Sequence, residues 1–324
     1  MSLSALMLAT GALLCLAGSG LVFVLARATE PWIGRLGARA QARLWLCFVI
    51  APPLATIVLV AAALAPTFGW IADHCGGANP HLDHPHICGH GPLPSLAFPV
   101  AALAGAFVLR VLIGLCVRLL QSRRAIHSLA KMDLGDAGSG YDGTIALEAP
   151  EAFTIGVFRS RIVLTEGLLH PSWEKHRGAI LAHEQAHVRR RDNLRLWIVF
   201  LTSLVHLPGV GRWLTSRVRY AQELAADEEA ATTLGNRETL AEALVAVARA
   251  RLHKRTEEGH LPFHAFGTHS IERRVHALLF GGHRPDHPGR WLLAFVFVLF
   301  CVSSTYFAGH VHDSMEHVLE VLSI

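Results

Sequence analysis

Residues 183–187 of the chain are His183-Glu184-Gln185-Ala186-His187, which places two histidines four positions apart with a glutamate between them. In a helix, side chains at positions i and i+4 lie on the same face. Both imidazoles can therefore bind one metal ion. The glutamate beside them can then take a proton from a water that the metal has acidified. The motif predicts the helix and the reacting groups of a zinc hydrolase.

The residues before this motif predict the helix that carries it. Ser172 stands where an N-cap is favoured, and Glu174 places an acid in the first turn. An apolar run leads from Ala179 into the motif. We expect a helix over residues 172–191.

A catalytic zinc ion needs a third protein ligand and one open coordination position. Glu223 is our candidate for the third ligand, and Asp227 lies one helical turn further on the same face. Asp227 can accept a hydrogen bond from the far nitrogen of a ligating histidine and so fix the tautomer of that ring. The alternative interpretation is that these carboxylates form an ordinary solvated acidic face.

The composition predicts a membrane protein. Hydrophobic residues make up 52% of the chain, and the mean hydropathy is positive. Four apolar stretches are near the ~20 residues that a membrane-spanning helix requires: residues 3–26, 44–66, 96–117 and 291–309. Because the first stretch has no Lys or Arg before Arg27, we interpret it as a retained anchor and not as a signal peptide.

The distribution of positive charge predicts the topology. Lys and Arg are concentrated in residues 27–43 and 121–290, whereas residues 1–26, 67–95 and 291–324 contain none. By the positive-inside rule, four crossings leave both termini outside and residues 121–290 in the cytoplasm. The net charge of +4 is accounted for by this pattern.

Two segments near the membrane have a less obvious role. We expect Arg110, inside the third apolar stretch, to reach the cytoplasmic side or to face protein, because an arginine that faces lipid is costly. The apolar segment from Leu196 to Leu207 is too short for a full crossing, so we interpret it as a helix that is buried in the domain or lies at the membrane interface.

The cytoplasmic segment is long enough for a core of its own. Three short strands are expected: residues 144–147, 153–158 and 161–165. The edge of such a sheet can hold an extended substrate by strand addition, or the sheet can simply cover the metal helix, and both interpretations stay open. Asn236 is expected to cap a helix that ends near Leu252, Ser270 to begin another that ends near Leu279, and residues 253–269 to be irregular.

These motifs resemble those of the BlaR/MecR-type antirepressor membrane zinc metallopeptidases and, more distantly, of the HtpX-type and CAAX-prenyl membrane zinc peptidases. The resemblance rests on four segments: residues 183–193, 223–227, 150–164 and 271–275. It implies a mainly α integral membrane protein of the bacterial inner membrane, with four transmembrane helices and a cytoplasmic gluzincin-like α+β zinc peptidase domain.

The resemblance also implies the chemistry and the substrate. One catalytic Zn²⁺ would be bound by His183, His187 and Glu223, with Glu184 as the base, and the substrate would be a cytoplasmic transcriptional repressor or the protein itself. Family members that sense β-lactams carry a penicillin-binding domain after the last span, whereas about fifteen residues follow residue 309 here. We therefore expect a chain that lacks this sensor domain and receives another signal.

The exterior segments are rich in metal-binding residue types. The 67–95 loop contains Cys75, Cys88, His74, His81, His84, His86 and His90, and the 310–324 tail adds further histidines. These side chains could bind Zn, Cu or Ni. Alternatively, Cys75 and Cys88 form a disulfide in an oxidising compartment and the histidines are merely solvated. An exterior metal is thus one hypothesis for the inducing signal.

Two other functions stay open beside the signalling peptidase. One is a membrane protein quality-control protease of the HtpX kind, and the other is a non-proteolytic transmembrane metal-binding signalling protein. A purely structural metal site would not need Glu184, which argues against the last of these. We expect a protein substrate and membrane lipid as partners and no direct contact with nucleic acid, since no nucleic-acid motif is found, while a homodimer stays open.

Overall fold

The computed structural model describes residues 3–64, 97–131, 135–257 and 266–281, which form a mainly helical molecule with one small sheet. Three of its helices are long and apolar enough to cross a membrane: Gly11–Ile33 within α1 (Leu3–Ile33), Ala38–Ala61 within α2 (Ala38–Leu64) and Ala102–Arg124 within α3 (Ala97–Lys131). They confirm the first three predicted apolar helices, although each continues further toward its charged end. The fourth predicted span, the 67–95 loop and the 310–324 tail lie outside the described residues.

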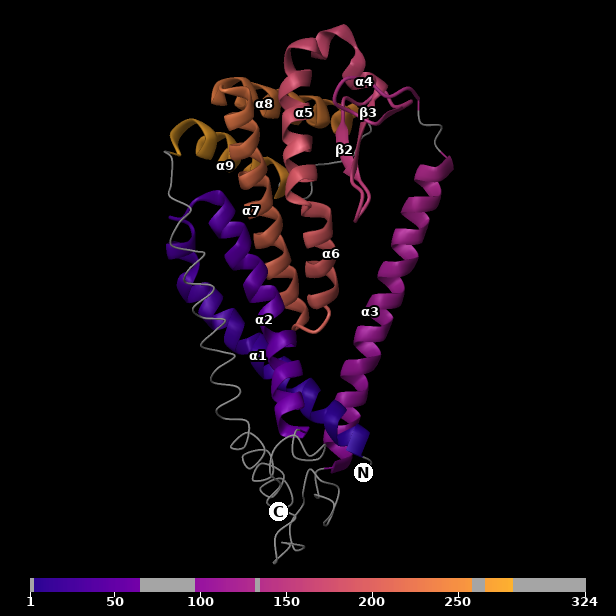
Figure 1. Ribbon diagram of the computed structural model, residues 1–324, viewed down its shortest axis with the longest axis vertical. Helices are drawn as coiled ribbons and strands as arrows, with labels where there is room; N and C mark the ends of the chain where they lie inside the picture. Colours follow the sequence, from indigo (N-terminus) through magenta and orange to yellow (C-terminus); the bar gives the residue numbers. More distant parts are fainter. Residues whose placement is uncertain (1–2, 65–96, 132–134, 258–265, 282–324) are drawn as a thin grey trace, which may run out of the picture.

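The other described elements gather at the end of the molecule away from the amino terminus (Figure 1). In chain order they are β1 (Gly143–Ile145), β2 (Ala152–Ile155), β3 (Arg161–Thr165), α4 (Glu166–Leu169), a 3-10 turn (Pro171–Trp173), α5 (Glu174–Arg190), α6 (Asp192–Thr202), α7 (Pro208–Leu234), α8 (Arg237–Glu257) and α9 (Phe266–Phe280). The helices α6 and α7 reach down between the long helices, so the two parts of the molecule are interleaved.

The small sheet has the strand order β1-β3-β2, with β1 parallel and β2 antiparallel to β3. All three predicted strands are present, but β1 and β2 end two and three residues earlier than predicted. The strand β2 ends at Ile155 because Gly156 follows with φ +94°, a conformation that other residues rarely adopt. Leu164 and Leu168 are fully buried and pack, with Ile162, against one side of α5.

The metal helix begins two residues later than predicted, and Ser172 is not its N-cap. Pro171 starts a 3-10 turn, because a proline fits the first position of a helical turn. Ser172 lies inside this turn, where its Oγ is 2.9 Å from Nδ1 of His170. The helix α5 then begins at Glu174 without a side-chain cap.

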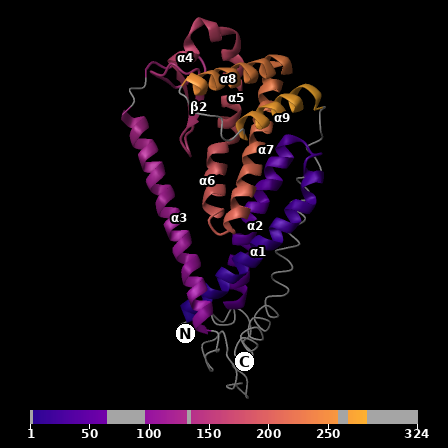
Figure 2. The same cartoon turned by 180° about the vertical axis from the view of Figure 1, so that it is seen from behind.

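The short apolar segment predicted at 196–207 forms α6 and the turn that leads into α7. Both helices pack against α2, and Figure 2 shows them from behind, beside α1 and α2. One apolar cluster joins the four helices, with members such as Val22 on α1, Val49 on α2, Val199 on α6 and Leu214 on α7. One face of the segment therefore packs against the long apolar helices, while Ile198, Leu201 and Leu207 are exposed.

Arg110 faces protein, in agreement with one of the two expected positions. Its Nη2 donates hydrogen bonds to the backbone carbonyls of Leu204 and His206, the latter at 3.0 Å. These carbonyls follow the end of α6, where no helical amide is available to them. The guanidinium of Arg110 thus supplies hydrogen bonds that the backbone would otherwise lack.

The helices after the metal site are longer than predicted. Asn236 caps α8 as expected, since its Oδ1 accepts a hydrogen bond of 3.1 Å from the amide of Thr239. However, α8 continues to Glu257 and α9 begins at Phe266, so the prediction of an irregular 253–269 segment is wrong at both ends. The polar residues that follow Leu252 include good helix formers, which extend a helix without an apolar pattern to reveal it.

The buried position of Leu164 predicts a large effect of its truncation on stability. Leu164→Ala should lower the free energy of unfolding by about 2–5 kcal/mol, because it leaves a cavity beneath the sheet. Leu147→Ala is the matched control, since Leu147 is 40% exposed and its truncation should cost less than about 1 kcal/mol. Denaturant unfolding of the full chain in mild detergent measures both values. Equal effects of the two substitutions would contradict the described core.

Candidate metal centre

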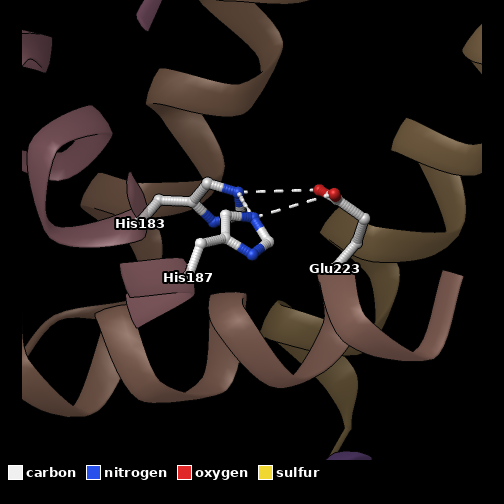
Figure 3. Close-up of side chains that lie close together, drawn as sticks. All are labelled: His183, His187 and Glu223. Carbon is white, nitrogen blue, oxygen red and sulfur yellow. Dashed lines mark hydrogen bonds and ion pairs between the residues drawn. The ribbon is translucent and has the colours of Figure 1, made fainter. Parts of the chain in front are cut away.

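The helices α5 and α7 bring together the three residues proposed as metal ligands. His183 and His187 project from one face of α5 toward Glu223 on α7 (Figure 3). The ring nitrogens Nε2 of the histidines are 3.1 Å apart and lie 3.5 and 3.7 Å from the two carboxylate oxygens of Glu223. One ligand atom from each of the three residues lies within 4.8 Å of the other two, so one ion can contact all three.

Each of the two histidines has a carboxylate next to its Nδ1 atom. Nδ1 of His187 is 2.9 Å from Oδ2 of Asp192, and Nδ1 of His183 is 3.0 Å from Oδ1 of Asp227, although this second contact is not a well-aligned hydrogen bond. Both carboxylates therefore favour the tautomer that protonates Nδ1 and leaves Nε2 free to bind a metal. Asp227 was placed in this role by the sequence, and Asp192 was not.

Asp227 is only 1% exposed, which argues against a solvated acidic face at this position. Arg274 on α9 accounts for its burial: Nε and Nη2 each lie 2.7 Å from an oxygen of Asp227, which makes a bidentate pair. Nη1 of the same guanidinium is 2.8 Å from Oε2 of Glu223. Arg274 thus holds both acidic residues of α7, a role that the sequence analysis missed because 47 positions separate it from Asp227.

The charges in this cluster shift one another's pKa values. Burial alone would lower the pKa of His183, but Asp227 and Glu223 raise it to about 10. Burial would raise the pKa of both carboxyl groups, yet His183 and Arg274 hold the pKa of Glu223, and Arg274 that of Asp227, well below the usual range. Both acids are therefore carboxylates at neutral pH.

Glu184 lies next to the ligands on α5, and the edge strand β2 fixes its side chain. The hydroxyl of Thr154 donates a hydrogen bond of 2.9 Å to Oε2 of Glu184. Thr154 is in turn held by Asn193 at the start of α6, whose Nδ2 donates to the carbonyls of Thr154 and Gly156 at 3.0 and 2.9 Å. The sequence had indicated Glu184 as the base, but neither Thr154 nor Asn193, because polar residues on short strands and helix ends carry no distinctive pattern.

A cavity of about 430 Å³ opens beside the ligands. Its polar side contains the three ligands and Glu184, and its apolar side is formed by α8 together with residues of α5 and α9: Ile180, Leu240, Leu244, Val247 and Ile271. The strand β2 lines a third side through Phe153 and Thr154. The cavity can therefore accept an apolar side chain while a peptide backbone lies along β2.

The donor set of this site fits zinc. Two imidazole nitrogens and one carboxylate oxygen form the three-ligand set of several zinc hydrolases, which leaves a fourth position open. Here the ligand atoms face the cavity, so that position is accessible to water and substrate. The Cys and His residues of the predicted exterior loop lie outside the described residues.

The fold and the site define a metallopeptidase domain joined to apolar helices of membrane-spanning length. Residues 144–278 match the family of BlaR1 peptidase M56, which confirms the resemblance to BlaR/MecR-type peptidases. The matched range extends from β1 to α9 and contains every residue of the metal centre described above. No curated protein and no solved structure matches the chain.

The contact between Asp227 and His183 predicts that Asp227 strengthens metal binding. Asp227→Asn should raise the dissociation constant for Zn²⁺ about 10- to 100-fold, because the His183 ring loses the carboxylate that orients it. Glu228→Gln on the same helix is the matched control and should leave the constant unchanged. Competition with a chromogenic chelator measures both. An unchanged affinity in Asp227→Asn would show that Asp227 does not support the ligand.

Proposed function

We propose that this protein is a membrane-bound zinc metalloendopeptidase of a signal-transduction system. The observation that carries the proposal is the convergence of His183, His187 and Glu223 beside Glu184, in a cavity that is lined by an edge strand. The match to BlaR1 peptidase M56 supports the peptidase reaction and the signalling role.

The residues of the chain have separate parts in the reaction. Zinc, when bound, supplies a Lewis acid that polarises the scissile carbonyl and acidifies water. Glu184 takes the proton of the attacking water and passes it to the leaving amine. Thr154 keeps the carboxylate of Glu184 in place through its hydrogen bond, so that the base does not have to be oriented during the reaction.

The strand β2 is the element on which a substrate can extend. The amide of Thr165 on β3 donates to the carbonyl of Glu151, and backbone groups of an antiparallel strand alternate between its two sides. The backbone groups of Ala152 and Thr154 therefore face away from β3, and no described strand pairs with them. Asn193 already donates a hydrogen bond to the Thr154 carbonyl. The amide and carbonyl of Ala152 therefore stay available to pair with a substrate strand.

The location and the substrate follow from charge and from the family. The positive-inside rule favours the cytoplasm for the metal centre, because Lys and Arg are concentrated in residues 27–43 and 121–290. The BlaR1-type match favours a transcriptional repressor as the substrate, with self-cleavage as a further reaction, in the bacterial inner membrane. An exterior metal bound by the histidine-rich loop is the inducing signal that we favour.

Substitution of the base tests the peptidase reaction. Glu184→Gln should lower the rate of repressor cleavage about 10²- to 10⁴-fold, because the amide cannot accept the proton of water. Thr154 should still hydrogen-bond to the new side chain, and the ligands are untouched, so bound Zn²⁺ should remain at one per chain. The measurement follows fragments of the co-expressed repressor over time.

The matched control is Gln185→Glu, which alters the neighbouring residue of the motif and should leave cleavage intact. Equal fragmentation by the wild type and Glu184→Gln would rule out the proposed reaction. Cleavage of unrelated unfolded membrane proteins, with the repressor left intact, would instead favour a quality-control protease.

The free edge of β2 makes a second prediction. Ala152→Pro removes an amide hydrogen that faces away from β3, so the sheet should form while a substrate strand loses one backbone hydrogen bond. We expect KM to rise roughly fivefold with little change in kcat, since such a bond is worth about 1 kcal/mol. Steady-state cleavage of a peptide containing the repressor site measures this. An unchanged KM in a variant with full zinc content would show that substrate does not pair with β2.

A further inference from the structure

The turn between α6 and α7, residues 203–207, is non-helical backbone that is packed among the three long helices. Within the turn, His206 is fully buried. The neighbours of His206 are Ser19 and Val49, which lie near the middle of the apolar stretches of α1 and α2. Irregular backbone at such a depth in a membrane is stable only where protein groups satisfy its hydrogen bonds.

Both ring nitrogens of His206 have hydrogen-bond partners. Nε2 of His206 lies 2.9 Å from the carbonyl of Val49, and because a carbonyl only accepts, Nε2 carries the hydrogen. Nδ1 then accepts from the hydroxyl of Ser19 at 3.2 Å. The same hydroxyl oxygen accepts a hydrogen bond of 3.0 Å from the amide of Leu207. His206 and Ser19 therefore join the turn to both α1 and α2.

The carbonyl of Val49 is available because of a proline. In a helix this carbonyl would accept from the amide of residue 53, but Pro53 lies inside α2 and has no amide hydrogen. His206 supplies the hydrogen bond that Pro53 cannot. The adjacent Pro52 also lacks an amide hydrogen, so the turn contacts α2 where the helical hydrogen-bond pattern is interrupted.

The third long helix contacts the same turn. Arg110 on α3 donates to the carbonyls of Leu204 and His206, and Arg118 donates to the hydroxyl of Ser203 at 3.2 Å. Gly114 lies between these two arginines, and a Cβ added there would be 2.5 Å from a methyl group of Leu204. The helix α3 therefore touches the turn closely, although its apolar stretch is otherwise little buried.

The two helices that flank this turn, α6 and α7, both lead to the metal centre. The helix α6 begins with Asp192, which contacts His187, and with Asn193, which holds the strand that fixes Glu184. The helix α7 carries Glu223 about 22 Å from its first residue, at 1.5 Å per residue. The turn is therefore connected through α6 to the groups around His187 and Glu184, and through α7 to Glu223.

We propose that the α6–α7 turn couples the arrangement of α1, α2 and α3 to the geometry of the metal centre. In this proposal His206 is the residue that positions the turn. The proposal rests on the proposed function and deepens it, because it names the route by which the membrane helices regulate the site. A signal that shifts α3 acts on the turn through Arg110 and Arg118, while His206 and Ser19 define its resting position.

The experiment uses the full chain in detergent and compares four variants. His206→Leu removes both hydrogen bonds of the ring, whereas His206→Gln keeps a donor in place of Nε2. Ser19→Ala removes the hydroxyl alone. Thr56→Val is the matched control, because it breaks a buried contact of 3.3 Å between Cys15 and Thr56 on the same two helices without touching the turn.

Two readouts report on the site without any substrate. The first is the affinity for Co²⁺ together with its visible absorption spectrum, which changes with ligand geometry. The second is amide hydrogen exchange in residues 183–193 and 220–227, measured without metal. His206→Leu should weaken Co²⁺ binding about tenfold, alter the spectrum and speed exchange in both segments. His206→Gln should restore most of the affinity, and Thr56→Val should match the wild type.

Three results would overturn the proposal. They are unchanged binding and exchange in His206→Leu, equal changes in His206→Leu and Thr56→Val, and no recovery in His206→Gln. If His206→Leu does not fold, Ser19→Ala replaces it, with an expected change of about threefold in affinity. Neither readout requires cleavage, so a protein that responds as expected but cleaves no substrate would contradict the proposed function alone.

Discussion

Asp227 is a carboxylate buried at the junction of three helices, and the positions of the metal ligands depend on its partners. An ion removed from water costs several kcal/mol unless its partners and hydrogen bonds offset that cost. Arg274 provides a bidentate pair from α9, and His183 provides a contact from α5. Because Asp227 itself lies on α7, these contacts hold α5 and α9 against the helix that carries Glu223. The ligands are thus brought together by the protein, and the site is preorganised for a metal.

The helix α7 belongs to both halves of the molecule. Its first half packs through Leu214 and Val218 into the apolar cluster with α1 and α2, and its second half carries Glu223 and Asp227. Fully buried alanines at 221, 225, 226 and 230 allow neighbouring helices to approach closely. It is continuous over 27 residues, so the apolar helices and the metal centre share a single rigid element. This sharing is the physical basis of the coupling that we propose.

The sequence was sufficient where the determining signals are local. The spacing of His183 and His187, the pair Glu223 and Asp227, and the cap at Asn236 each involve a few residues, so helical geometry alone predicts them. Ser172 was misplaced because Pro171 competes for the helix start, and local rules do not rank the two signals. Arg274 was missed because only the fold brings α9 beside α7.

The contacts around the α6–α7 turn show most clearly what a linear pattern cannot reveal. In the sequence, Pro53 is merely a helix-disturbing residue, His206 a histidine in an apolar segment, and Arg110 a costly charge in a span. In the structure these residues complement one another. Pro53 leaves the Val49 carbonyl without a helical donor, and His206 donates to that carbonyl. Arg110 donates to the carbonyls beyond the end of α6. A residue with an amide hydrogen at position 53 would compete with His206 for Val49. Pro53 therefore contributes to the position of the turn as much as His206 does.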